Sequence, residues 1–125
     1  MGKKILLCED SAFFAQAIAT VLKTQGYLVV HAADGQIGIN LLKEQKDFDL
    51  ILCDIMMPNL DGFGVLKEIN RDPELSGLEI PFIFLTGVSD VDSMDKGNQL
   101  GAKDYFIKSN VGMDKIIDLV KKYTE

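Results

Sequence analysis

The chain has 125 residues, 47% of them hydrophobic and 26% charged, which fits one domain with a buried core and excludes a disordered chain. Its 19 acidic residues outnumber the 13 basic ones and give a formal charge of −6, so we expect no direct nucleic-acid binding. Two cysteines, no recognisable signal peptide and no apolar run long enough to cross a bilayer predict a reduced, cytoplasmic setting without membrane insertion.

Short apolar runs alternate along the chain with segments of helical periodicity. The apolar runs predict five strands, at residues 5–8, 27–30, 50–53, 80–85 and 105–107. These runs are continuous rather than alternating, which is typical of strands covered on both faces. Five strand–helix units in succession predict an α/β fold, with a single doubly wound parallel sheet and five helices on its two faces.

The expected helices have recognisable starts and ends. Ser11 is a typical N-cap for the first helix, and Gly26 is a typical residue for its left-handed end. The second helix follows with Ile37 facing inward, and the third closes before Pro73. The fourth helix, at residues 89–100, has few apolar anchors, whereas the fifth, near the C-terminus, carries a clear apolar stripe.

Polar side chains follow four of the predicted strands at the point where each strand ends. Glu9 and Asp10 follow the first strand, and Asp54 follows the third. Thr86 follows the fourth strand, and Lys108 follows the fifth. Ligands of open α/β sheets gather at the carboxyl ends of the strands. We therefore expect these five side chains to lie together at one edge of the sheet.

Three carboxylates brought together repel one another unless one keeps a proton or a cation neutralises them. Mg²⁺ fits such a site, because it binds carboxylates and accepts phosphate oxygens. Lys108 and Thr86 would then offer a positive charge and a hydroxyl to an anion on the metal. This combination indicates phosphoryl transfer, in which a carboxylate can itself be the nucleophile.

Five segments, taken in order and at the usual spacing, resemble response-regulator receiver domains: residues 7–11, 52–58, 61–62, 85–87 and 101–108. The resemblance covers essentially the whole chain and assigns residues 1–125 to one domain. It implies the flavodoxin-like strand order 2-1-3-4-5 of chemotaxis-type regulators.

The resemblance also implies a role for each residue of the site. Asp54 matches the phosphoacceptor, which takes a phosphoryl group from the phosphohistidine of a sensor histidine kinase or phosphotransfer protein. Glu9 and Asp10 match the acidic pair that holds Mg²⁺ together with Asp54 and the backbone carbonyl of Met56. Lys108 matches the lysine that pairs with the phosphoryl oxygens. Such a domain catalyses its own phosphorylation and dephosphorylation and turns over no separate substrate.

A switch is implied as well. Thr86 matches the hydroxyl that moves to meet the phosphoryl group, and Tyr105 matches the aromatic side chain that follows it. The surface of the fourth helix, fifth strand and fifth helix would then change its preference for a downstream protein or output domain. The charges of the last helix also allow a phosphorylation-dependent dimer.

The chain departs from the family pattern after Lys108, where Ser109 replaces a proline that usually follows a cis bond. A cis bond before a non-proline residue costs about 2.5–4 kcal/mol, so both a trans bond and a strained cis bond stay open. Met56 and Val88 flank the expected site and are apolar. Neither side chain can hold an attacking water by hydrogen bonding, so we expect slow self-dephosphorylation.

Other interpretations are less favoured. A pseudo-receiver that binds a partner without phosphorylation would not need the intact acid cluster. An aspartate-nucleophile phosphatase would need an Asp-x-Asp after the first strand, which residues 8–12 lack. Flavin binding is disfavoured by the acids in the same loop. We expect His31 to be structural, and Cys8 and Cys53 to be buried, inert thiols.

Overall fold

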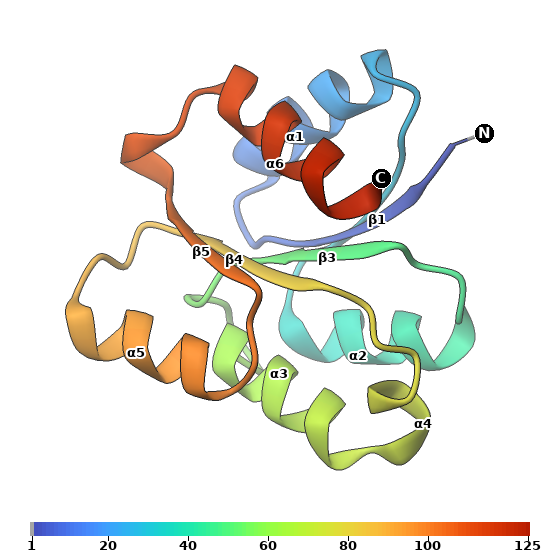
Figure 1. Cartoon of the computed structure of the whole chain (residues 1–125), viewed down its shortest axis with the longest axis vertical. Helices are drawn as coiled ribbons and strands as arrows, with labels where there is room; N and C mark the ends of the chain where they lie inside the picture. Colours follow the sequence, from blue (N-terminus) through green and yellow to red (C-terminus); the bar gives the residue numbers. More distant parts are fainter. Residues whose placement is uncertain (1) are drawn as a thin grey trace.

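A computed structural model describes residues 2–125 of the chain. Five parallel strands pair in the order β2-β1-β3-β4-β5, which confirms the predicted sheet. The elements are β1 Lys4–Cys8, α1 Ala12–Thr24, β2 Leu28–Ala32, α2 Gly35–Glu44, β3 Leu50–Cys53, α3 Gly62–Arg71, α4 Pro73–Ser76, β4 Phe82–Thr86, α5 Val91–Gln99, β5 Asp104–Ile107, the 3₁₀ turn η1 Lys108–Asn110 and α6 Met113–Thr124. Helices α1 and α6 cover one face, and α2 to α5 cover the other (Figure 1).

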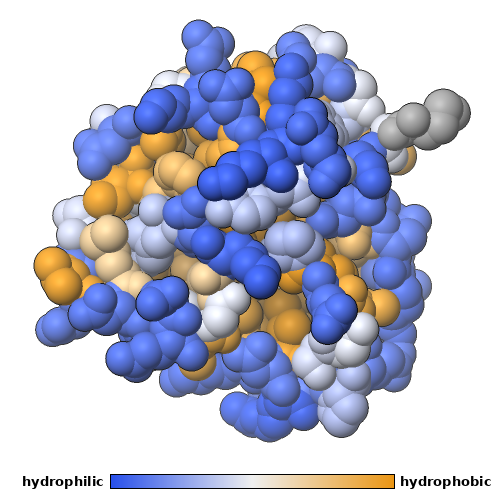
Figure 2. Space-filling view, viewed as in Figure 1, coloured by the Kyte–Doolittle hydropathy of each residue, from blue (hydrophilic) through white to orange (hydrophobic). Residues whose placement is uncertain are grey.

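The two faces of the sheet bury two separate sets of side chains. Successive residues of a strand point to opposite faces, so each continuous apolar run supplies both cores. On β3, Leu50 and Leu52 pack toward α1 and α6, whereas Ile51 and Cys53 pack toward α2 and α3. Outside these cores, hydrophilic side chains cover most of the face shown in Figure 2, with hydrophobic ones in the gaps between them.

The first helix begins and ends as predicted. The Ser11 Oγ accepts a hydrogen bond from the Phe14 N–H at 3.3 Å, and Gly26 follows the helix with a φ of 89°. A left-handed φ suits glycine, which lacks the Cβ that would clash there. The chain therefore turns back into β2, which begins at Leu28, one residue after the predicted start.

One more helix is present than the five predicted. The short helix α4 follows α3 directly, because Asp72 caps its first turn by accepting a hydrogen bond from the Glu74 N–H at 2.9 Å. Pro73 is its first residue, where the missing N–H of proline costs nothing. The proline that ends α3 thus also begins the next helix.

The inward orientation predicted for Ile37 is wrong. Ile37 is 43% exposed, and the buried face of α2 runs instead through Gly35, Gly38, Ile39 and Leu42. At Gly38 a Cβ would lie 2.7 Å from the Cys8 Sγ, so the helix packs against β1 through a glycine. A pattern of apolar side chains cannot reveal a contact face made partly of glycine.

The weakly anchored fourth predicted helix is α5, in which Gly97 is the one buried residue. The peptide bond between Lys108 and Ser109 is trans, since residues 2–125 contain no cis bond. None of the helices in this described part is both long and apolar enough to cross a bilayer.

Candidate functional site

Three carboxylates meet at the carboxyl ends of β1 and β3. Cys8 pairs with Cys53 in the register of these neighbouring strands, so the residues that follow them lie side by side. Glu9, Asp10 and Asp54 each offer an oxygen within 4.8 Å of the others. Glu9 is 2% exposed and Asp54 6%, whereas Asp10 is exposed to solvent. The structure thus brings together the three predicted acids, and their hard oxygen ligands suit a cation such as Mg²⁺.

Lys108 reaches this cluster from the end of β5. Its Nζ lies 2.6 Å from the Glu9 Oε1 and 2.9 Å from the Asp54 Oδ2, and its side chain is 22% exposed. Burial lowers the pKa of Lys108, but the hydrogen bonds to Glu9 and Asp54 outweigh burial and raise it overall. Burial raises the pKa of Glu9, although the bond from Lys108 opposes this shift. The ammonium therefore stays charged and balances one of the three acids.

Asp54 is both fixed and reachable. Its Oδ1 accepts a hydrogen bond from the Ile55 N–H at 2.7 Å, and its Oδ2 accepts one from Lys108. An open depression of about 480 Å³ leads to it, lined by Glu9, Asp10, Ser11, Asp54, Met56, Gly87, Val88 and Lys108. Each carboxylate oxygen is oriented by a donor, and an anion from solvent can approach the group.

Thr86 and Tyr105 converge on Val88, in the loop between β4 and α5. The buried Thr86 Oγ1 accepts a hydrogen bond from the Val88 N–H at 3.3 Å. The Tyr105 hydroxyl donates to the Val88 carbonyl at 2.6 Å. Burial raises the pKa of Tyr105, and the negative charges of Asp90 and Asp54 add to the shift. Both predicted switch residues thus hold the same loop residue.

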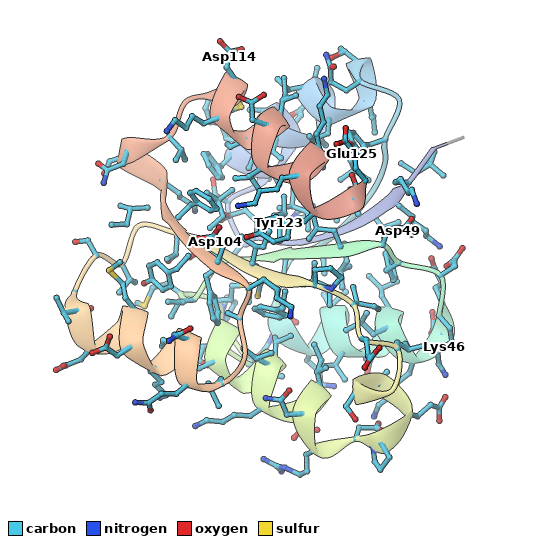
Figure 3. The ribbon with its side chains drawn as sticks, viewed as in Figure 1. Lys46, Asp49, Asp104, Asp114, Tyr123 and Glu125 are labelled. Atoms are coloured by element: carbon cyan, nitrogen blue, oxygen red, sulfur yellow. The ribbon has the colours of Figure 1, made fainter. Side chains whose placement is uncertain are left out.

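A second tyrosine, Tyr123, links α6 to β5. The Tyr123 hydroxyl donates to the Asp104 Oδ2 at 2.8 Å, and the two side chains point toward one another in Figure 3. This bond raises the pKa of Tyr123. The last helix is therefore fixed to β5, whereas α5 has one buried residue. Between the two helices that flank β5, α5 is the less anchored.

Three further residues contact the site, although the sequence pattern did not assign them to it. The Ser11 N–H donates to the Glu9 Oε2 at 3.0 Å, and the His31 Nε2 donates to the Glu9 carbonyl at 2.6 Å. The Phe14 ring centroid lies 4.3 Å from the Lys108 Nζ. Phe14 lies one helical turn beyond Asp10, a spacing that could have indicated proximity but not a partner.

The remaining predicted residues lie at the rim or beneath the site. The Met56 side chain is exposed at the rim of the depression, and Val88 is half-buried beside it. Cys8 and Cys53 are fully buried free thiols, and burial raises the pKa of Cys53 well above its usual range. Burial without ionisation is what an inert thiol requires.

Comparison with known proteins identifies a shared sequence pattern. A family model described as "Response regulator receiver domain" matches residues 5–121. The "Probable transcriptional regulator ycf27" of Guillardia theta is 40% identical over 106 residues, which are 85% of this chain and 39% of that protein. The "Transcriptional regulatory protein AfsQ1" of Streptomyces coelicolor is 39% identical over 104 residues, 83% of this chain and 44% of that one. The chain spans less than half the length of these relatives.

Solved structures share the whole arrangement. The receiver domain of the Francisella response regulator 1452 superposes with a TM-score of 0.87 at 28% identity, covering 98% of this chain and 97% of that one. The chemotaxis protein CheY4 of Vibrio cholerae has the same TM-score at 24% identity, covering 98% and 99%, which shows a common fold.

Proposed function

The chain belongs to the response-regulator receiver family, and on that premise we propose that Asp54 accepts a phosphoryl group in a Mg²⁺-dependent reaction. The observation that carries this proposal is the setting of Asp54, 6% exposed, held by Ile55 and Lys108 and open to an anion through one depression. The single domain would span residues 1–125 and work in the cytoplasm.

The donor would be the phosphohistidine of a sensor histidine kinase or phosphotransfer protein. An Asp54 oxygen attacks phosphorus, an O–P bond forms and the P–N bond breaks, and the leaving imidazole keeps the electron pair and takes up a proton. Glu9, Asp10 and Asp54, with the Met56 carbonyl as a further ligand, would hold Mg²⁺, which supplies positive charge to the phosphoryl oxygens. Lys108 stabilises the same oxygens with its ammonium. The site thereby catalyses its own modification.

The response to phosphorylation would pass through Thr86 and Tyr105. A phosphoryl group on Asp54 is a stronger acceptor than the carboxylate and attracts the Thr86 hydroxyl. The Val88 N–H then loses its bond to Thr86, and the loop that Tyr105 also holds can move. Because α5 is weakly anchored, the surface of α5, β5 and α6 would change its partner preference.

The partner at this surface would be a downstream protein, an output domain or a second copy of the chain. The matched relatives are named as transcriptional regulators, and the chain covers less than half of each, which supports an output domain as the regulated partner. The apolar Met56 and Val88 beside the depression would leave an attacking water unpositioned, so the phosphorylated state should decay slowly.

Intact mass after incubation with acetyl phosphate tests the proposal, with and without Mg²⁺. We expect one phosphoryl addition that requires Mg²⁺ and is lost in Asp54→Asn. Asp47→Asn is the matched control, because Asp47 is an exposed aspartate that pairs with Lys4 far from the cluster. Absence of any addition would contradict the proposal and favour a pseudo-receiver that binds its partner unmodified.

A further inference from the structure

The ammonium of Lys108 has three neighbours, one of which is an aromatic ring. Two are the carboxylates of Glu9 and Asp54, at 2.6 and 2.9 Å. The third is the ring of Phe14, whose centroid lies 4.3 Å from Nζ. A cation within about 6 Å of a ring centroid is attracted by the negative face of the ring. Phe14 has no charge and no ligand atom, so neither a metal ion nor a phosphoryl group would engage it in place of Lys108.

Phe14 is itself fixed by the loop that carries the acids. Its N–H donates to the Ser11 Oγ at 3.3 Å, and the Ser11 N–H donates to the Glu9 Oε2 at 3.0 Å. Glu9 contacts Lys108 through its other oxygen, so the contacts form a closed circuit from Ser11 through Glu9 and Lys108 to Phe14. The half-buried Phe14 ring also packs against the core between the sheet and α1 and α6.

The backbone on the other side constrains Lys108 less. Lys108 begins the 3₁₀ turn η1, and within residues 2–125 no side chain caps this turn. The two residues that follow, Ser109 and Asn110, are exposed, and the bond to Ser109 is trans. The orientation of the ammonium therefore depends on its side-chain contacts rather than on a rigid loop.

We propose that Phe14 is a positioning residue, whose ring holds the Lys108 ammonium beside Asp54. This inference rests on the proposed function for its effect on phosphorylation. The carboxylates of Glu9 and Asp54 take part in the proposed reaction themselves, Glu9 as a ligand of Mg²⁺ and Asp54 as the phosphoacceptor. The ring keeps the ammonium in place when those partners are shared with a cation or a phosphoryl group.

The test compares Phe14→Leu, which removes the ring, with Phe14→Tyr, which keeps it. Phe13→Leu is the matched control, since Phe13 is the adjacent residue on α1 and is 86% exposed. Initial rates of phosphorylation by acetyl phosphate with Mg²⁺ are expected to fall about fivefold in Phe14→Leu, the equivalent of about 1 kcal/mol. Phe14→Tyr and Phe13→Leu should keep the phosphorylation rate of the chain without substitutions.

A second measurement does not depend on phosphorylation. The Lys108 side-chain protons should show an upfield ring-current shift in NMR spectra that disappears in Phe14→Leu and persists in Phe14→Tyr. Fluorinated phenylalanine at position 14 weakens the negative face of the ring with little change of volume. The phosphorylation rate should therefore fall stepwise with fluorination, even if Phe14→Leu disturbs packing.

The outcomes separate the two proposals. If the chain without substitutions takes no phosphoryl group, the proposed function fails. The NMR shift of the Lys108 side-chain protons alone then decides whether the ring holds the ammonium. The inference would be overturned if the Lys108 side-chain protons showed no upfield shift. It would also be overturned if the phosphorylation rate stayed the same across the fluorinated series.

Discussion

Replacing Lys108 by methionine should remove the positive charge that balances one of the three carboxylates in the acid cluster. The substitution keeps much of the side-chain volume but removes the ammonium that bonds to Glu9 and Asp54 at 2.6 and 2.9 Å. Removing one partner of a buried ion pair costs about 3–5 kcal/mol, because the other charge stays buried without compensation. The carboxyl of Glu9 can take up a proton, which limits the cost, so we expect a loss of about 3 kcal/mol. At about 4 °C per kcal/mol for a domain of this size, the midpoint of thermal unfolding should fall by about 12 °C.

Urea or thermal unfolding in the presence of a chelator measures this loss, with Lys115→Met as the matched control for an exposed lysine. Adding Mg²⁺ should stabilise Lys108→Met more than it stabilises the chain without substitutions, because in the variant no ammonium competes for the carboxylates. Burial raises the pKa of folded Glu9 above its ordinary value of 4.5, so the folded state binds a proton more tightly than the unfolded one. The deficit of the variant should therefore shrink as the pH falls toward that value. A variant as stable as the control, with the same response to Mg²⁺, would refute the reasoning.

Three further substitutions test the scaffold of the site. The pKa of Asp34 is lowered by hydrogen bonds from the Ile37 N–H and the Asn59 side chain, so its contribution to stability is present above 3.8 and is lost as the pH falls through the folded value. Asp34→Asn should flatten that part of the acid-unfolding curve, and an unchanged curve would contradict the assignment. Gly62→Ala would place a Cβ 2.2 Å from the backbone carbonyl oxygen that follows β3, and should cost about 3 kcal/mol in urea unfolding. Gly87→Ala, with open space around its Cβ, is the control, and equal costs would disprove the steric argument. Tyr105→Phe removes the 2.6 Å bond to the loop between β4 and α5 and should lower the unfolding free energy by about 1 kcal/mol, whereas no loss would mean that solvent replaces the bond freely.

The sequence was sufficient to predict the sheet because its strands carry their information locally. A continuous apolar run followed by a polar residue marks both a buried strand and its carboxyl end, as at Cys53 and Asp54. Parallel strands place all such ends on one edge, so Glu9 and Asp54 could be expected to meet before any distance was known. Prediction at this level needs only the direction of the strands.

The errors and omissions arise where a contact depends on how two distant elements pack together, which the residues of either element alone do not indicate. Ile37 was assigned inward because it is apolar, whereas α2 approaches the sheet through glycines that have no hydrophobic signal. Phe14 lies on α1, and its place above the Lys108 ammonium depends on where β5 ends in three dimensions. The nature of the 108–109 bond likewise follows from the loop conformation, which residue identities left open.

The proposed pairing of one lysine with one divalent ion follows from the charges of the site. Glu9, Asp10 and Asp54 carry three negative charges when ionised, and Lys108 returns one, so two remain to be balanced. A divalent cation removes that excess, whereas a second lysine would remove half of it and could not bind phosphoryl oxygens as ligands. Phosphorylation of Asp54 would change its charge from −1 to about −2, and the added phosphoryl oxygens would accept a further hydrogen bond. The hydroxyl that β4 offers is that of Thr86, whose Oγ1 accepts a 3.3 Å hydrogen bond from the Val88 N–H and which could exchange that weak bond for a charge-assisted one. Under the proposed function, charge balance at the acid cluster would couple chemistry at Asp54 to the loop before α5 through Thr86.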